Sequence, residues 1–145
     1  MMQITEFMGD DHQRCDHIFA RAEESVSKGD WSNAADINRQ FVDAMEHHFR
    51  MEEEMLFPRF EEVSGHTMGP TEVMRHEHRQ MRQLFEQMNR AAADQSVDDY
   101  LGASETLLIL MQQHNAKEEQ MLYPMSDQVL AGEQDELINK LEAVE

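Results

Sequence analysis

Apolar side chains recur at helical spacing in four long runs, and short segments of turn-forming residues separate these runs. The expected helices cover residues 3–28, 31–64, 71–93 and 97–130. Gly29 ends the first run, Asp30 is a good N-cap for the second, and Pro70 is placed to open the third. Alternating β-branched runs and hairpin turns are absent from the sequence. Because short links between long helices favour antiparallel neighbours, we predict an all-α, up-down-up-down antiparallel four-helix bundle.

Residues 133–145 form a tail beyond the fourth run. Its apolar side chains share one helical face, which predicts a short C-terminal helix that caps the bundle. These side chains are Leu137, Ile138, Leu141 and Val144. At 145 residues the chain is long enough to bury a core of its own, so we expect a single domain over 1–145.

One phrase of the sequence occurs twice. The pattern H-x3-E-E-x-M-L-[FY]-P begins at His48 and again at His114, 66 residues later. The same offset carries His12 onto His78, each inside the pattern M-x2-[DE]-H. The chain therefore contains two similar helix pairs, and each pair supplies one lone histidine and one His-x3-Glu. Both copies of the long phrase end in proline, which predicts matching helix interruptions at Pro58 and Pro124.

The repeated residues have the chemistry of a metal site. Positions i and i+4 share one face of a helix, so each His-x3-Glu presents its histidine and its glutamate together. Burying such groups costs several kcal/mol each unless they are paired or bind a metal, and imidazole with carboxylate suits iron, manganese or zinc. Four histidines and two carboxylates are too many for one tetrahedral zinc, but they fit two ions bridged by the glutamates. The predicted ligands are His12, His48, Glu52, His78, His114 and Glu118.

The inward face of each helix is expected to continue beyond these ligands. Seven residues further on stand Met55 and Met121 in one pair of helices, and Phe19 and Phe85 in the other. The four remaining histidines lack a histidine counterpart in the repeat, so we expect them to be solvated or outside the direct ligand set. They are His17, His47, His66 and His76. The single cysteine, Cys15, is expected to fill space in the core.

The net charge and the cysteine content limit the classes of binding partner and the cellular compartment that we expect. A net charge of −18 argues against nucleic acid and against an anionic membrane surface as partners. The sequence has no apolar stretch of transmembrane length, and its first residues do not resemble a signal peptide. One cysteine provides no disulfide framework, so we expect a cytoplasmic protein. No protein partner can be inferred from these features.

The four ligand segments resemble those of the hemerythrin-like (HHE cation-binding) domain family, over nearly the whole chain. The resemblance implies a four-helix bundle with a non-haem centre of two iron ions, Fe2+ or Fe3+, joined by an oxo, hydroxo or water bridge. It also implies a small ligand, either a diatomic molecule such as oxygen or nitric oxide, or a peroxide.

The sequence departs from the oxygen-carrying hemerythrins at two places. Their third helix carries His-x3-His, whereas the residue four after His78 is Arg82. Their fourth helix carries His-x4-Asp, whereas this chain has His114-x3-Glu118. The resulting set of four histidines and two glutamates is more similar to the di-iron proteins that repair iron–sulfur clusters.

Two residues break the symmetry of the repeat. Asp16 follows His12 by four residues, as Arg82 follows His78. We expect these two side chains to pair across the bundle, with Asp16 as a seventh ligand as the alternative. Tyr123 stands where the first copy has Phe57, and its hydroxyl either hydrogen-bonds a metal-bound ligand or reaches the end of the bundle.

The leading function from sequence is therefore a di-iron protein that binds or senses a small oxidant. Iron storage, sensing or donation, including repair of iron–sulfur clusters, is the alternative. Ferritin-like oxidases use Glu-x2-His, which no histidine of this chain completes, so oxidase or peroxidase catalysis is less favoured and no catalytic residue is predicted. Three histidines on one ion would suit end-on oxygen binding, whereas two on each would suit nitric oxide or peroxide. A metal-free structural bundle is the remaining possibility.

Overall fold

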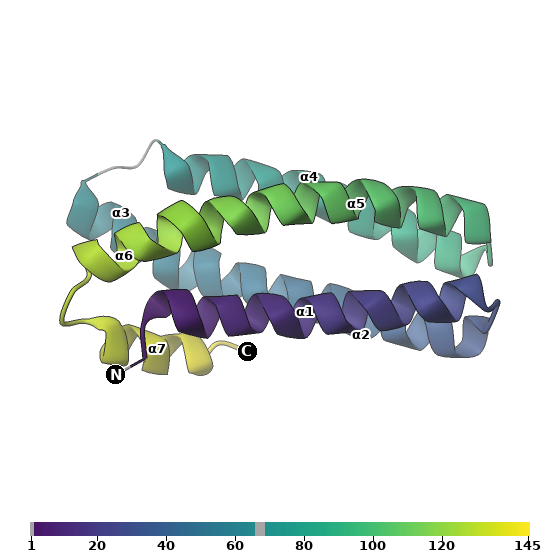
Figure 1. Cartoon of the computed structure of the whole chain (residues 1–145), viewed down its shortest axis with the longest axis horizontal. Coiled ribbons are helices and arrows are strands. Elements are labelled where there is room, and N and C mark those ends of the chain that lie inside the picture. The colour runs from purple at the N-terminus through teal and green to yellow at the C-terminus, as the bar shows by residue number, and fades with distance from the viewer. Residues whose placement is uncertain (1, 66–68) are drawn as a thin grey trace.

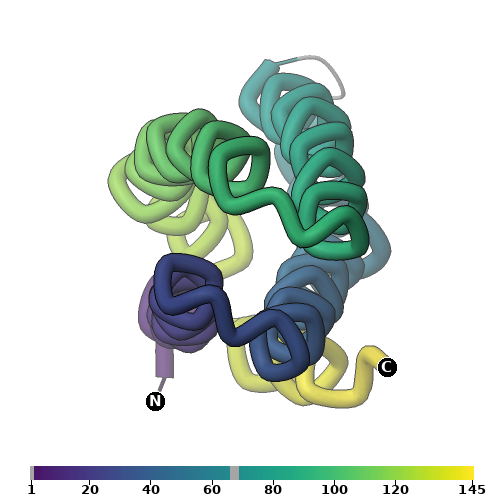
Figure 2. Tube along the Cα trace, turned by 90° about the vertical axis from the view of Figure 1, so that its right-hand side faces the viewer, coloured from purple at the N-terminus to yellow at the C-terminus, as the bar shows by residue number. Residues whose placement is uncertain are grey.

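The structure is a computed structural model that describes residues 2–65 and 69–145. Four long antiparallel helices form its body: α1 (Ile4–Ser27), α2 (Trp31–Arg50), α4 (Pro70–Ala93) and α5 (Val97–Lys117) (Figure 1). Seen along the bundle in Figure 2, one helix stands at each corner of a square, and α1 lies beside α2 and α5 but diagonally opposite α4. The described residues contain no strand, so the predicted all-α bundle is confirmed.

Turn chemistry ends the helices near the predicted positions. Gly29 and Gly65 adopt positive φ angles of 70° and 77°, which glycine reaches without steric cost. Pro70 opens α4, where its missing N–H breaks no helical hydrogen bond. Asp30 is the N-cap residue of α2, but its side chain makes no capping hydrogen bond. In α5, by contrast, the N-cap residue Ser96 does cap the helix: its side-chain oxygen accepts a hydrogen bond from the Asp99 N–H at 3.3 Å.

The helix interruptions predicted at the two prolines are present, and they take the form of matching π-helical segments. In the first copy η1 (Met51–Leu56) joins α2 to α3 (Phe57–Ser64), and in the second η2 (Glu118–Leu122) joins α5 to α6 (Tyr123–Val129). The N–H of the residue before each proline donates five positions back, to the carbonyl of Glu52 or Glu118. The wider turn lets a proline follow without the clash that it would cause inside a regular α-helix.

These π-helical segments rotate the residues that follow them. A π turn contains an extra residue, so the buried face no longer continues seven positions after the histidine. Met121 is consequently 59% exposed, while Leu122 and Tyr123 are buried, and the prediction that Met121 faces inward is wrong. Met55 is only partly buried. Phe19 and Phe85 lie on helices without this interruption, and both are buried as predicted.

The apolar core is divided into two clusters with a polar layer between them. One cluster fills the end of the bundle near the α1–α2 and α4–α5 turns and includes Phe41 and Leu107. Cys15 belongs to it, and burial raises the pKa of the thiol to about 11, as suits the predicted space-filling role. The second cluster includes Leu56 and receives Leu141 from α7 (Gln134–Glu142), so the predicted C-terminal helix is present and packs against the core. None of the described helices is long and apolar enough to cross a membrane.

Candidate metal centre

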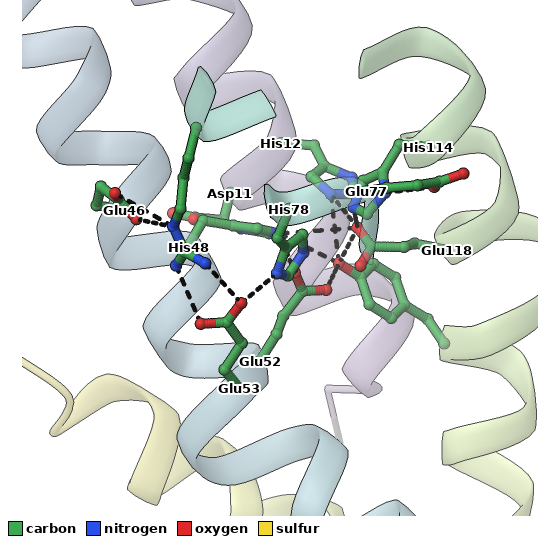
Figure 3. Close-up of polar contacts among 12 residues, drawn as sticks. Asp11, His12, Glu46, His48, Glu52, Glu53, Glu77, His78, His114 and Glu118 are labelled. Carbon is green, nitrogen blue, oxygen red and sulfur yellow. Dashed lines mark hydrogen bonds and ion pairs between the residues drawn. The ribbon is translucent and has the colours of Figure 1, made fainter. Parts of the chain in front are cut away.

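The polar layer between the two apolar clusters is made of the six predicted side chains (Figure 3). Each long helix contributes one histidine, and the two π-helical segments contribute Glu52 and Glu118. All six side chains are between 0% and 5% exposed. Their donor atoms form two groups, each spanning no more than 4.8 Å: Glu52, His78, His114 and Glu118 in one, and His12, His48 and Glu118 in the other. The structure therefore brings together every residue that the repeat singled out.

Distances within the layer follow the internal repeat. Each glutamate makes its two shortest histidine contacts with one histidine from each copy of the repeat. Shifting the residue numbers of one glutamate's contacts by 66 gives the contacts of the other glutamate. The contacts are His12 Nε2–Glu118 Oε1 at 2.9 Å, His114 Nε2–Glu118 Oε1 at 3.3 Å, His78 Nε2–Glu52 Oε1 at 3.1 Å and His48 Nε2–Glu52 Oε1 at 3.5 Å. The two glutamates are thus related by the same pseudo-twofold symmetry as the two copies of the repeat.

Several buried polar atoms in this layer have no hydrogen-bond partner among the described residues. They are His12 Nδ1, Glu52 Oε1, His78 Nε2, His114 Nε2 and Glu118 Oε2. A buried polar atom without a partner costs roughly 1–3 kcal/mol, and here all such side-chain atoms belong to five of the six predicted ligands. Imidazole nitrogens and carboxylate oxygens are electron-pair donors, so this set of atoms fits a bound cation.

An outer ring of carboxylates orients the four imidazoles. Each histidine turns its Nδ1 away from the layer toward an acidic residue, and the repeat relates these contacts in pairs. The contacts are His48–Asp11 (2.7 Å), His114–Glu77 (2.8 Å), His78–Glu53 (2.7 Å) and His12–Glu119 (3.3 Å). Three are hydrogen bonds from Nδ1–H. A carboxylate on Nδ1 fixes the ring and leaves Nε2 to bind a metal.

Sequence reasoning missed the role of this outer ring, although both copies of the repeat contain it. An acid stands directly before each lone histidine, and a second glutamate directly follows each predicted ligand glutamate. Because both features recur at the offset of 66, this recurrence was the signal in the sequence that these acids belong to the site. Neither feature reveals which histidine the acid contacts. Asp11, for example, is adjacent to His12 in the sequence but binds His48 on the neighbouring helix.

The electrostatics of the layer are dominated by mutual neutralisation of imidazoles and carboxylates. Burial lowers the pKa of His114, but the nearby Glu118 and the hydrogen bond to Glu77 outweigh it and raise that pKa to about 10. Burial and repulsion from Glu118 raise the pKa of Glu52. Burial also acts to raise the pKa of Glu118, but its histidine neighbours, with His114 first, hold it well below the usual range. Without a metal, the histidines therefore act as the counter-cations of the carboxylates.

Tyr123 brings a hydroxyl group into the centre of the layer. Its ring stacks on His12 at 5.6 Å, just as its repeat counterpart Phe57 stacks on His78 at 5.7 Å. The hydroxyl oxygen lies 2.7 Å from Glu52 Oε2 and 2.9 Å from Glu118 Oε1, so its one proton is shared between these carboxylates. Burial and the same carboxylates hold the tyrosine pKa well above its ordinary value, so the hydroxyl keeps its proton. Of the two predicted positions, the structure has the hydroxyl in the centre.

The predicted ion pair between Asp16 and Arg82 is wrong. Arg82 binds Glu53 through two nitrogens, both at 3.0 Å, and Glu46 through Nε at 2.9 Å. Asp16 is exposed on α1, diagonally opposite the helix that carries Arg82, so the two side chains face different seams of the bundle. Burial acts to raise the pKa of Glu53, but hydrogen bonds from His78 and Arg82 lower it to about 2.

The three other histidines that the structure describes lie outside the cluster. His17 and His76 are exposed, as predicted. His47 is half-buried and bonds to the carbonyl of Val144 at 2.9 Å, which ties the C-terminal residues to α2. His66 lies outside the described residues.

A family model described as the hemerythrin HHE cation binding domain matches residues 3–126. The matched segment contains the four long helices and both π-helical segments, and so the whole His/Glu cluster. Searches of curated proteins and of solved structures gave no match.

Proposed function

The chain belongs to the hemerythrin HHE cation-binding domain family, and on this premise we propose that it is a non-haem di-iron protein that binds or senses a small oxidant. Oxygen, nitric oxide and peroxide are the oxidants considered. The proposed iron ligands are His12, His48, Glu52, His78, His114 and Glu118.

One observation supports two ions rather than one. The donor atoms divide into two groups, each with two histidines, and Glu118 belongs to both. A carboxylate has two oxygens and can serve two ions, so Glu118 and Glu52 suit bridging positions. Two histidines on each ion favour nitric oxide or peroxide over the end-on oxygen binding that a three-histidine ion would suit.

Iron in this position would supply electron transfer and open positions for a small ligand. The chain's own residues would control access and protonation. Side chains no more than 5% exposed exclude bulky substrates, and the rings of Phe49 and Phe57 stack on His78 and keep water from that side. The hydroxyl oxygen of Tyr123 lies 2.9 Å from Glu118 Oε1, so the hydroxyl can donate a hydrogen bond to a ligand bound beside that carboxylate.

Metal analysis of protein purified without added metal tests the centre. We expect two irons per chain in the wild type and a loss of at least one in His114→Ala. His76→Ala is the matched control, because His76 is exposed on α4 and should leave the iron content unchanged. Zinc alone in the wild type, or an unchanged iron content in His114→Ala, would refute the proposed centre.

Exposure of the reduced protein to oxidants tests the activity. Anaerobic ferrous protein should change its visible absorption on addition of oxygen, nitric oxide or peroxide, one reagent at a time. A band that forms in air and disappears under nitrogen would indicate reversible oxygen binding, whereas permanent oxidation would rule it out. Unchanged absorption with all three reagents, together with rapid loss of iron to a weak chelator, would replace this proposal with iron storage or donation.

A further inference from the structure

The internal repeat relates two seams of the bundle, which can be compared position by position. Both seams join one copy to the other: the offset of 66 relates α2 to α5 and α1 to α4, so the seam between α2 and α4 corresponds to the seam between α5 and α1. The first seam is closed by Arg82. Its guanidinium binds Glu53 and Glu46, and it lies over the ring of Phe49 at 5.0 Å. Phe49 in turn stacks on His78 at 3.8 Å, so the histidine is covered from outside.

The second seam keeps only one glutamate of this closure. At an offset of 66, the counterparts of Arg82, Glu53, Glu46 and Phe49 are Asp16, Glu119, Gln112 and Asn115. These four residues line a groove between α1 and α5 with a volume of about 580 Å³. The seam therefore has a carboxylate in place of the guanidinium and an amide in place of the covering ring. The result is an open groove where the related seam is sealed.

The groove lies on the outer side of a predicted metal ligand, His12, because Glu119 both lines the groove and contacts that histidine. His12 is 5% exposed, and its Nδ1 has no hydrogen-bond partner among the described residues. This atom is directed at Glu119, whose Oε2 lies 3.3 Å away. Glu119 is 43% exposed, compared with 23% for Glu53 on the sealed seam. Glu119 thus belongs both to the groove wall and to the surroundings of His12.

The groove carries only negative charge. Its lining contains the carboxylates of Asp16, Glu23 and Glu119 and includes no lysine or arginine. Asp16 makes no hydrogen bond or ion pair with any of the residues that the structure describes. Acidic residues on a concave surface concentrate cations, and the net charge of −18 adds to the attraction.

We propose that Asp16 and Glu119 form a transient capture site for divalent cations, through which ferrous iron passes from solvent to His12 and the buried centre. This inference rests on the proposed function, because it concerns how that centre is loaded. It assigns a role to the symmetry break between Asp16 and Arg82: one seam is closed by an ion-pair network, and the related seam admits cations.

The rate of metal uptake tests this route independently of any activity. Metal-free protein is mixed anaerobically with Co2+ as the probe, the growth of its visible absorption is followed, and the final metal content is measured. Asp16→Arg places the residue of the sealed seam beside Glu119. At low ionic strength it should slow loading by at least about tenfold while leaving the final metal content unchanged. Asp16→Asn, which keeps the size of the side chain, should slow loading by a smaller factor.

Asp43→Arg is the matched control, since it makes the same change of charge at an exposed position on α2. It should load within about twofold of the wild-type rate, because the charge change lies away from the groove. Equal loading rates in Asp16→Arg and Asp43→Arg, or an unchanged rate in Asp16→Asn, would overturn the proposed route. If the final metal content were still full, the proposed metal centre would stand. A wild-type chain that takes up no metal would overturn the centre and the route together.

Discussion

Replacing Tyr123 by phenylalanine removes one buried hydroxyl and leaves the ring in place. The change copies the residue found at the related position, Phe57, where a phenyl ring packs against His78 without any hydroxyl. In the metal-free protein the hydroxyl donates to the carboxylates of Glu52 and Glu118, at 2.7 and 2.9 Å, and all three side chains are fully buried. Its loss therefore removes the donor to Glu52 Oε2, whereas Glu118 Oε1 keeps His12 Nε2 at 2.9 Å.

The cost follows from the strength of hydrogen bonds to charged groups. Such a bond contributes about 1.5–3 kcal/mol, and the unsatisfied oxygen adds its own desolvation, so Tyr123→Phe should lower the free energy of unfolding by ~2–4 kcal/mol. For a chain of 145 residues this corresponds to a fall in Tm of about 5–12 °C. Metal loading should reduce the difference, because bound cations would satisfy the same carboxylate oxygens.

Urea unfolding of the metal-free protein, followed by circular dichroism, measures this effect. Tyr100→Phe is the matched control, since Tyr100 is also fully buried but donates a single hydrogen bond, 2.8 Å long, to the neutral side chain of Asn38. The control should cost about 1 kcal/mol. If Tyr123→Phe costs no more than Tyr100→Phe, the hydroxyl does not stabilise the buried carboxylates and the reasoning is refuted.

Three further predictions concern the orienting carboxylates, pH and the C-terminal helix. Asp11→Ala should weaken metal affinity about 10–100-fold in a chelator competition, because His48 loses the acid that orients it, whereas Asp10→Ala at the adjacent exposed position should not. The folded-state pKa of His114, about 10, exceeds its unfolded value. Its contribution to metal-free stability is therefore complete below about pH 6.5 and lost as the pH rises through 10. Alkaline unfolding curves should show a fall that is smaller in His114→Gln, where only the other three raised histidine pKa values remain. Leu141→Ala should cost about 2–5 kcal/mol in urea unfolding, since that side chain is fully buried, and a cost below about 1 kcal/mol would exclude α7 from the core.

Much of the candidate site could be predicted from helical periodicity, which depends only on residues close together in the sequence. His48 and Glu52 share a helix face because four residues make about one turn, and His114 and Glu118 repeat the arrangement. The repeat then distinguished His12 and His78 from histidines of the same helices that lack a counterpart. Each inference needs only positions along one helix and the comparison of two copies.

Contacts between helices could not be predicted from positions along one helix or from the comparison of the two copies. The pairing of Arg82 with Glu46 and Glu53, and not with Asp16, depends on which helices share a seam of the bundle. The exposure of Met121 depends on a π-helical turn, which shifts the angular position of the residues after it.

By itself, the sequence determined the helices, the internal repeat and the six side chains that gather in the polar layer, because helical periodicity assigns each residue a face. Only the tertiary structure decided how the outer carboxylates are shared, where the Tyr123 hydroxyl lies, and that one seam is sealed while its counterpart is open. The physical reason is that a helix face is set by neighbours within a few residues. A contact across a seam joins residues far apart in the chain, such as Arg82 and Glu46, and exists only once the bundle has packed.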